Sequence, residues 1–263
     1  MKKVFAMVMT MVMLLSICAF SCAEESDLKY VQEKGVMIIG ITDFEPMDYM
    51  VDGDWTGFDA ELARLVCEKL GVKAQFQEIS WAMKETELAG RSIDCIWNGL
   101  TWSEERAENM GMSDPYMLNR QVIVVGAGNA ERFTEVASFK GASVAAESGS
   151  AGEELIQNVL GDAVYIEKEG QIDALTELLF GTVDAVVIDY TMAYYLINKE
   201  GSDFASLVIL DNFVEAEEEY YAIACRKGSD MTDAVNAALK ELKDDGTVDA
   251  LADQYGLKDA VVK

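Results

Sequence analysis

Two stretches of the chain read alike: LAGRSIDCI at residues 88–96 and LFGTVDAV at residues 179–186. Each begins with the last apolar residues of an expected helix, passes a glycine that stops the helix, and continues through a short turn into an apolar strand. A helix followed in this way by a buried strand is part of a β-α-β unit. Because the pattern occurs in both halves of the chain, it indicates two related α/β units.

The segments that precede these stretches repeat as well. Residues 35–41 and 140–146 are short apolar strands, and helix-like stretches follow at residues 58–70 and 152–160, before Gly71 and Gly161. Strands that alternate with helices predict mostly parallel sheets with helices on both faces. The predicted fold class is therefore α/β, in two lobes.

Neither of the two prolines lies in a linker rich in Pro, Gly or Ser, so extended crossings are expected to join the lobes. The first crossing is placed at residues 114–116, before a strand at residues 121–125. The return crossing is placed at residues 212–219. This division assigns residues 24–118 and 219–263 to lobe 1 and residues 119–218 to lobe 2, with lobe 1 ending in helices at residues 230–243 and 247–255.

Ligands of open α/β sheets bind beyond the carboxyl ends of the strands. Four segments follow expected strands, two from each half of the chain: residues 43–45, 98–101, 147–150 and 189–190. A cleft between the lobes would bring all four together. Asp94 and Asp184 precede their strands, so they are interpreted as turn residues and not as ligands.

The run DCIWNGLTWSEER at residues 94–106 is interpreted as a strand, a glycine-containing loop and a helix capped by Ser103. Arg106 then lies in the first turn, where a cation opposes the helix dipole at a cost of about 0.3–1 kcal/mol that a bound anion would offset. Arginine also binds a carboxylate through two parallel hydrogen bonds. The alternative is a surface salt bridge with Glu104 or another acid.

The chain resembles the family 3 extracellular solute-binding proteins, the amino-acid receptors of ABC importers. The resemblance runs from about Gly35 to Leu257 and rests on the order and spacing of short motifs at residues 52–53, 57–63, 90–106, 113–116, 181–185, 220–224 and 245–247. It implies a two-lobed fold of the type II periplasmic-binding-protein class. It also implies that ligand binding closes the two lobes.

The resemblance implies roles for particular residues. In the family an arginine and nearby loops hold the ligand's α-carboxylate, an acid of the second lobe holds its ammonium group, and aromatic residues flank its side chain. The matching residues are Arg106, Gly99, Thr101 and Ser150 for the carboxylate, Asp189 for the ammonium group, and Phe44 and Trp81 beside the side chain. Many relatives carry a second hydroxyl residue where this chain has Ala151, whose backbone amide could serve instead.

Structural alternatives stand beside these assignments. Phe44 and Trp81 could be core aromatic residues, Asp189 could be a strand-end or helix-capping residue, and Thr101 could satisfy a turn.

The charge near the expected cleft favours a polar or cationic ligand side chain. Glu147 follows a strand of the second lobe, and Asp43 and Glu45 follow the first strand. The basic residue assigned to the site, Arg106, is used by the α-carboxylate, so an acidic side chain would be buried without a partner. Alternatively, Glu147 orders its own loop and the other two acids face water.

The first residues predict export. Lys2 and Lys3 precede an apolar run at residues 4–17, which is typical of a signal peptide and is assigned to residues 1–23. Ordinary cleavage near Ala23 and a lipobox that would acylate Cys22 are both compatible with the residues. The predicted location is the periplasm or the outer face of the cytoplasmic membrane.

Composition excludes several classes of function. The formal charge is −26, so nucleic acid is not an expected partner. The chain has no histidine, which excludes Ser-His-Asp and Cys-His catalysis and the usual zinc sites. No metal or cofactor is expected. Beyond the signal region, Cys67, Cys95 and Cys225 are expected to be buried thiols, with a Cys67–Cys95 bridge as the alternative.

The sequence thus predicts a non-enzymatic, monomeric receptor that captures a free L-amino acid and delivers it to the membrane permease of an ABC importer. Two alternatives remain open. One is the receptor of a separate sensor. The other is a periplasmic dehydratase acting on a prephenate-like substrate, with Glu147 as its acid.

Overall fold

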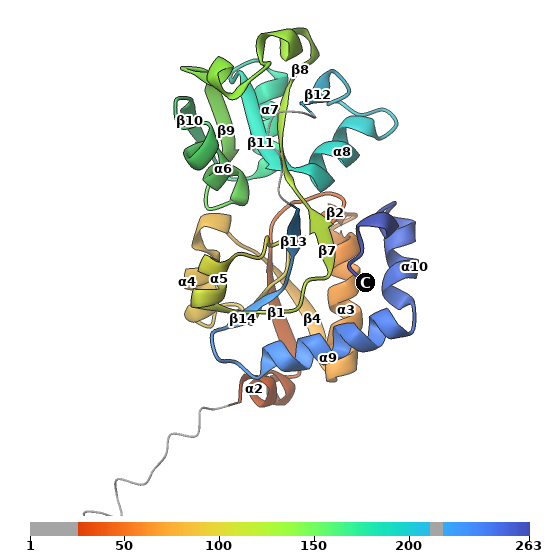
Figure 1. The fold of residues 1–263 in the computed structure, drawn as a ribbon. Helices are drawn as coiled ribbons and strands as arrows, with labels where there is room; N and C mark the ends of the chain where they lie inside the picture. The colour runs from red at the N-terminus through yellow and green to blue at the C-terminus, as the bar shows by residue number, and fades with distance from the viewer. Residues whose placement is uncertain (1–25, 211–217) are drawn as a thin grey trace, which may run out of the picture.

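The computed structural model describes residues 26–210 and 218–263 and has two lobes joined at a narrow waist (Figure 1). The signal peptide expected at residues 1–23, including Cys22, lies outside the described residues, as do residues 212–217 of the expected return crossing. Within the described ranges, no helix combines the length and the apolar character needed to cross a membrane.

Lobe 1, the lower lobe in Figure 1, contains a five-stranded sheet with the order β4-β1-β5-β14-β6. Strand β1 runs parallel to β4 and β5, whereas β14 is antiparallel to both of its neighbours. Strands β2 and β3 form a separate antiparallel hairpin. The elements are α2 (Asp27–Lys34), β1 (Val36–Ile41), β2 (Tyr49–Val51), β3 (Asp54–Thr56), α3 (Phe58–Leu70), β4 (Lys73–Glu78), α4 (Lys84–Ala89), β5 (Cys95–Ile96), α5 (Glu104–Asn109), β6 (Met110–Met112), β14 (Ala224–Arg226), α9 (Met231–Asp244) and α10 (Thr247–Gln254).

Lobe 2 contains a second five-stranded sheet, with the order β10-β9-β11-β8-β12. Strands β10, β9 and β11 are parallel, and β8 is antiparallel to β11 and β12. Each lobe therefore has one strand that opposes the others, which confirms the prediction of mostly parallel sheets. The elements are β8 (Gln121–Gly126), β9 (Ser143–Glu147), α6 (Ala151–Val159), β10 (Val164–Lys168), α7 (Gln171–Leu179), β11 (Ala185–Asp189), α8 (Tyr190–Asn198) and β12 (Leu207–Ile209).

Alternating side chains of β11 show why both faces of this sheet are covered. Ala185 and Val187 pack in a cluster with Ile156 of α6, whereas Val186 and Ile188 pack in the larger cluster that includes α7 and α8. A strand that is buried on both faces reads as a continuous apolar run. This is the pattern that the sequence showed at residues 185–188.

The helix boundaries follow from caps that are visible in the sequence. Helix α3 begins at Phe58 and ends at Leu70, as predicted, because Gly71 adopts a left-handed φ of 76°. Helix α6 begins one residue earlier than predicted because Ser150 caps it.

Two short strands form the waist between the lobes. Strand β7 (Met117–Asn119) pairs with β13 (Glu219–Tyr221) in antiparallel fashion, with Leu118 opposite Tyr220. The chain passes from β7 into β8 and from β13 into β14. Each crossing therefore leads into the strand that runs against the rest of its sheet.

Asp94 and Asp184 have equivalent structural roles in the two lobes. A carboxylate oxygen of Asp94 accepts from the backbone N–H of Ile38 at 2.8 Å, and one of Asp184 accepts from that of Ser143 at 2.9 Å. Each aspartate thus ties the start of one strand to the strand beside it. The interpretation of both as turn residues is confirmed.

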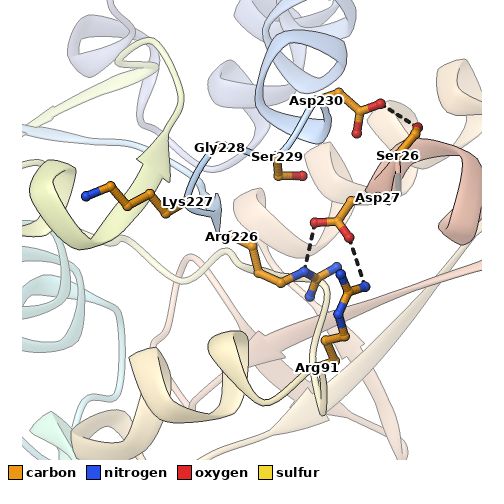
Figure 2. Close-up of a pocket in the computed structure, with 8 residues that line it drawn as sticks. All are labelled: Ser26, Asp27, Arg91, Arg226, Lys227, Gly228, Ser229 and Asp230. Atoms are coloured by element: carbon orange, nitrogen blue, oxygen red, sulfur yellow. Dashed lines mark hydrogen bonds and ion pairs between the residues drawn. The ribbon is translucent and has the colours of Figure 1, made fainter. Parts of the chain in front are cut away.

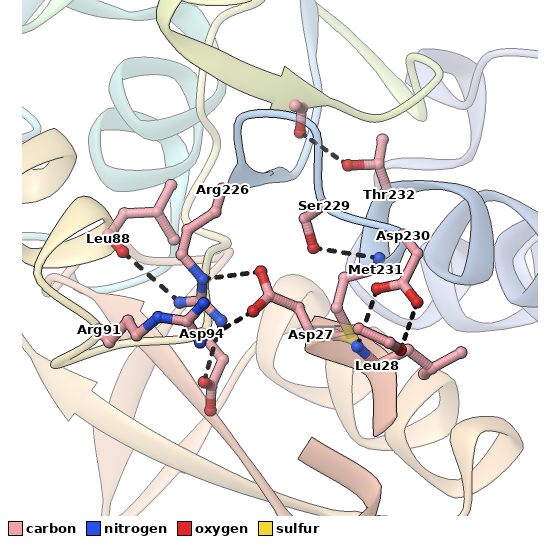
Figure 3. Close-up of polar contacts among 12 residues, drawn as sticks. Asp27, Leu28, Leu88, Arg91, Asp94, Arg226, Ser229, Asp230, Met231 and Thr232 are labelled. Atoms are coloured by element: carbon pink, nitrogen blue, oxygen red, sulfur yellow. Dashed lines mark hydrogen bonds and ion pairs between the residues drawn. The ribbon is translucent and has the colours of Figure 1, made fainter. Parts of the chain in front are cut away.

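Buried charges fix helix α2 to the base of lobe 1 (Figure 2). Asp27 accepts from Arg226 Nε at 2.8 Å and pairs with Arg91 Nη1 at 2.9 Å. Figure 3 shows the same guanidinium of Arg226 beside Asp94, 3.5 Å away. A pocket opens at this base, but both of its guanidinium groups are already paired with carboxylates. We therefore interpret the cluster as structural.

The three described cysteines are free and buried. Burial raises the pKa of the Cys67 thiol to about 12, so the reactive thiolate is scarce at neutral pH. The expectation of buried thiols is confirmed, and the alternative of a Cys67–Cys95 bridge is wrong.

Candidate functional site

A small buried cavity lies between the lobes, where the carboxyl ends of strands from both sheets meet. Of the nine predicted site residues, eight line it and Phe44 does not. Two further polar residues line it: Asn98, which lies in the expected segment 98–101, and Gln171, which the sequence did not single out. The lining consists of Trp81, Asn98, Gly99, Thr101 and Arg106 from lobe 1 and Glu147, Ser150, Ala151, Gln171 and Asp189 from lobe 2.

Arg106 is held by the short helix α5 that the sequence predicted. Ser103 caps this helix, and its Oγ accepts from the backbone N–H of Arg106 at 3.2 Å. The guanidinium group donates through Nη1 to the carbonyl oxygen of Thr101 and through Nη2 to Glu154 Oε1, both at 2.7 Å. Its ion-pair partner is therefore an acid of helix α6 in the opposite lobe and not Glu104.

The N-terminus of helix α6 faces the same cavity. Ser150 is its N-cap, and the Oγ accepts from the N–H of Glu153 at 3.1 Å. The hydroxyl oxygen is thus partly used by the helix itself, which leaves its proton to donate. Ala151, the first helical residue, belongs to the turn whose backbone N–H groups lack carbonyl partners inside a helix. This end of α6 therefore presents donors and a positive dipole to the cavity.

Asp189 is a fully enclosed carboxylate held by neutral donors. Its Oδ1 accepts from Gln121 Nε2 at 2.9 Å, from the Tyr221 hydroxyl at 3.1 Å and from the Asn119 amide. Its Oδ2 accepts from Gln171 Nε2 at 2.5 Å. Burial raises the pKa of Asp189, while these hydrogen bonds oppose the rise.

The second lone pair of Asp189 Oδ2 has no donor within the described ranges. Asp189 is the last residue of β11 and occupies the N-cap position of α8, as the structural alternative expected, but its side chain makes no capping hydrogen bond to that helix. Gln171 begins helix α7 and was not expected in the site because strand β10 (Val164–Lys168), which ends three residues before it, was not among the strands predicted from the sequence. The preceding glycine, Gly170, was the available signal for that helix start.

Gly99 shapes the loop between β5 and α5. It has a positive φ of 57°, and a Cβ at this position would lie 2.2 Å from Phe44 Cε1. Its N–H donates to Asp59 Oδ2 at 2.8 Å, so this amide is already occupied. The backbone N–H of Gly99 is therefore not available to a ligand, which corrects the expectation for Gly99.

Phe44 lies behind this loop and not in the cavity. Its ring packs edge-on against Tyr221, with centroids 6.2 Å apart, and only 2% of the residue is exposed. The prediction that Phe44 flanks a ligand is wrong because the ring fills the space left by the missing Gly99 side chain. Phe44 is a core residue that supports the loop.

Three acids, Glu147, Asp43 and Glu45, were expected near the side chain of the ligand. Of these three, Glu147 alone lines the cavity. It is 3% exposed, and its Oε1 has no hydrogen-bond partner within the described residues. Burial, followed by the charge of Asp189, raises the pKa of Glu147 to about 8. Asp43 is instead exposed, and Glu45 pairs with Lys199 at 2.6 Å. The expectation of three acids around the ligand side chain is therefore wrong for these two.

Polar contacts between the lobes hold the cavity closed. Besides the pair of Arg106 with Glu154, Lys84 Nζ of lobe 1 donates to the carbonyl oxygen of Gly149 at 2.8 Å. A further ion pair joins Lys199 of lobe 2 to Glu45 of lobe 1, so that here the cation belongs to lobe 2. The described conformation is therefore a closed one.

The family model of the bacterial extracellular solute-binding proteins, family 3, matches residues 37–258. The chain belongs to this family. The resemblance seen in the motifs is thus confirmed, and the two-lobed α/β architecture described above agrees with it.

The names of individual relatives state that these proteins bind amino acids. The L-cystine-binding protein TcyJ of Escherichia coli (strain K12) is 30% identical, and the match covers 94% of this chain and 92% of that protein. The arginine-binding extracellular protein ArtP of Bacillus subtilis (strain 168) is also 30% identical, over 84% and 86% of the two chains. An ABC uptake transporter substrate-binding protein from Streptococcus pneumoniae with bound histidine superposes with a TM-score of 0.83 at 28% identity, over 92% and 100% of the two chains.

Proposed function

We propose that this protein is an exported receptor that captures a free L-amino acid with a polar or cationic side chain between its lobes and delivers it to the membrane permease of an ABC importer. The observation that carries this proposal is the pair of opposite charges buried in one cavity, Arg106 from lobe 1 and Asp189 from lobe 2. An α-amino acid carries the complementary pair of charges on one carbon atom. The names of the relatives, which specify cystine, arginine and histidine, support the same class of ligand.

The proposed carboxylate end consists of Arg106, Thr101 and the start of helix α6. A guanidinium group can donate two parallel hydrogen bonds to a carboxylate. The Ser150 hydroxyl and the Ala151 amide add donors at the positive end of the helix dipole. Glu154 holds Nη2 of Arg106 in the closed structure, but its side chain is 51% exposed and can turn to solvent when a ligand arrives.

The proposed ammonium end is Asp189. Asn119, Gln121, Gln171 and Tyr221 fix its carboxylate, so a bound ammonium group would meet a preorganised acceptor. Two of these donors, Asn119 and Tyr221, belong to the waist strands β7 and β13. The ammonium site is therefore tied directly to the place about which the lobes would move.

Ligand binding is expected to close the lobes about the waist, because only the closed form brings Arg106 and Asp189 to one ligand. Small-angle scattering should give a smaller radius of gyration at saturating ligand than without ligand. The Arg106→Met protein at the same ligand concentration is the control, and its radius should not fall. An unchanged radius in the wild-type protein at confirmed saturation would contradict the closure mechanism.

The affinity for a cationic amino acid is expected to rise with pH through the titration of Glu147. In the ligand-free protein the pKa of this carboxyl is about 8, and a bound cation favours its ionised form. Binding must then release a proton below this pKa, so the affinity falls as the pH falls, by at most about tenfold per pH unit, and levels off above it. The charged groups around Glu147 are Asp189, Lys84 and Asp173.

The measurement is calorimetry with L-arginine from about pH 6 to pH 8, a window in which arginine keeps its own charges. Glu147→Gln should flatten the profile, whereas Glu104→Gln, a change at an exposed acid of the same lobe as Arg106, should leave it unchanged. A wild-type affinity that is flat over this range would contradict the proposed contact between Glu147 and a ligand cation.

Calorimetry against a panel of free L-amino acids tests the proposed function as a whole. Competition then orders the side chains: arginine, lysine and glutamine should displace a bound probe better than glutamate or leucine does. The opposite order would refute the preference for a polar or cationic side chain while leaving amino-acid capture in place.

The dehydratase alternative has its own direct test. A buried carboxyl such as Glu147 that keeps its proton near neutral pH could act as a general acid. We expect purified protein incubated with prephenate or arogenate to give no change in product absorbance. Turnover that Glu147→Gln abolishes would instead establish an enzyme.

A further inference from the structure

Lys84 is a buried cation at the contact between the lobes. It begins helix α4 and is only 5% exposed. Its Nζ donates to the carbonyl oxygens of Gly149 at 2.8 Å and Trp81 at 3.2 Å, and it lies 4.8 Å from the centre of the Trp81 ring. Within the described ranges no carboxylate forms an ion pair with it. Burying an ammonium group without a carboxylate is costly, which suggests that the partner is supplied from outside.

Glu147 is the matching acid without a cation. It ends strand β9 of lobe 2, and one of its carboxylate oxygens has no hydrogen-bond partner in the part of the chain that the structure describes. The loop from Glu147 to Ser150 contains Gly149, whose carbonyl oxygen accepts a hydrogen bond from the Lys84 ammonium group. Lys84 and Glu147 are therefore neighbours across the cleft, and the charge of each influences the titration of the other. Trp81 lines the cavity beside both.

Two cations of lobe 1, Arg106 and Lys84, thus lie between the lobes together with the two acids of lobe 2 that line the cavity, Glu147 and Asp189. Arg106 and Asp189 are sufficient for the α-carboxylate and the ammonium group of any amino acid. A cationic ligand side chain would satisfy Glu147 but would meet the charge of Lys84, and an acidic side chain would do the reverse. Only a side chain that carries both charges complements the second pair.

We propose that the substrate is a diamino dicarboxylic acid, in which a short linker joins two α-amino acid heads. Arg106 and Asp189 bind one head, and Lys84 and Glu147 bind the carboxylate and the ammonium group of the other. This inference rests on the proposed function and narrows it. The carbonyl oxygen of Gly149 belongs to the opposite lobe and is released when the lobes separate, which frees that hydrogen-bond position of the Lys84 ammonium group for the ligand.

The test is calorimetry with L-cystine, L-cystathionine and L-lanthionine, compared with L-lysine, L-arginine and L-glutamine. At least one of the first three is expected to bind about tenfold more tightly than each of the others, which is the range for an additional charge-assisted contact. S-(2-aminoethyl)-L-cysteine is lanthionine without its second carboxylate, and S-(2-carboxyethyl)-L-cysteine is lanthionine without its second amino group. Each should bind less tightly than lanthionine.

Substitutions of Lys84 and Glu147 test whether these residues bind the second α-amino acid group of the ligand. Lys84→Met and Glu147→Gln should each weaken binding of the best diamino dicarboxylic acid by about tenfold or more, and should weaken it by a larger factor than they weaken binding of glutamine. Lys84→Met should also remove the difference between lanthionine and its analogue that lacks the carboxylate, a readout that a merely structural role would not produce. Thermal unfolding of each variant verifies that it is folded.

The outcomes separate this inference from the function on which it rests. If arginine or glutamine binds through Arg106 but none of the three diamino dicarboxylic acids binds more tightly, the inference is wrong and the receptor function stands. If Lys84→Met leaves their affinity unchanged, the second head does not bind at Lys84. If no amino acid binds at all, both proposals fail.

Discussion

Arg106→Met is expected to weaken amino-acid binding by about 30-fold or more, since removing one partner of a buried charged pair costs about 2–5 kcal/mol. Methionine keeps most of the side-chain volume but cannot donate to the ligand carboxylate or to the carbonyl oxygen of Thr101. The loss is large because the ligand carboxylate would then be buried without a cation. Its only remaining partners would be the neutral donors at the start of helix α6.

The measurement is isothermal titration calorimetry with the tightest-binding amino acid. Arg64→Met is a matched control, because Arg64 is an exposed arginine of the same lobe that donates to the carbonyl oxygen of Trp55. It should bind like the wild type. An Arg106→Met protein that is folded, as judged by circular dichroism, and binds with wild-type affinity would refute the assignment of the carboxylate site.

Asp189→Asn is expected to weaken binding by a similar or larger factor, about 30-fold or more. The change removes the charge that would hold the ligand's ammonium group. It also places an amide N–H₂ group among the donors of Asn119, Gln121, Gln171 and Tyr221, which then compete for one remaining oxygen. The affinity should therefore fall even though the side chain keeps its shape.

The matched control for this change is Asp43→Asn, because Asp43 is exposed and does not line the cavity. Its affinity should equal that of the wild type. If Asp189→Asn retains wild-type affinity while Asp43→Asn loses it, the ammonium site lies after strand β1 and the present assignment is wrong.

The sequence predicts well those features that depend on local chemistry. Glycine stops and serine caps place α3, α5 and α6 to within one residue, because they act over a single turn. The rule that ligands bind beyond the carboxyl ends of strands finds Thr101, Glu147 and Asp189, which the fold does bring together.

The sequence does not predict features that depend on contacts between distant segments. Gln171 and Lys84 lie at helix starts, and no local pattern reveals that one reaches Asp189 and the other Gly149 of the opposite lobe. Phe44 was misplaced for a related reason. Its position after a strand points to the cleft, but the space beside Gly99 draws the ring into the core. The direction of a side chain at a strand end is decided by such packing and not by its order in the chain.

The most direct test of the central claim is to titrate the protein with its tightest-binding amino acid and with two analogues of it. One analogue lacks the α-carboxylate, and the other lacks the α-ammonium group. Capture between Arg106 and Asp189 predicts one molecule bound per chain and a loss of about 30-fold or more in affinity for each analogue. If no amino acid binds, or if either analogue binds as tightly as the parent compound, this account of the site is contradicted.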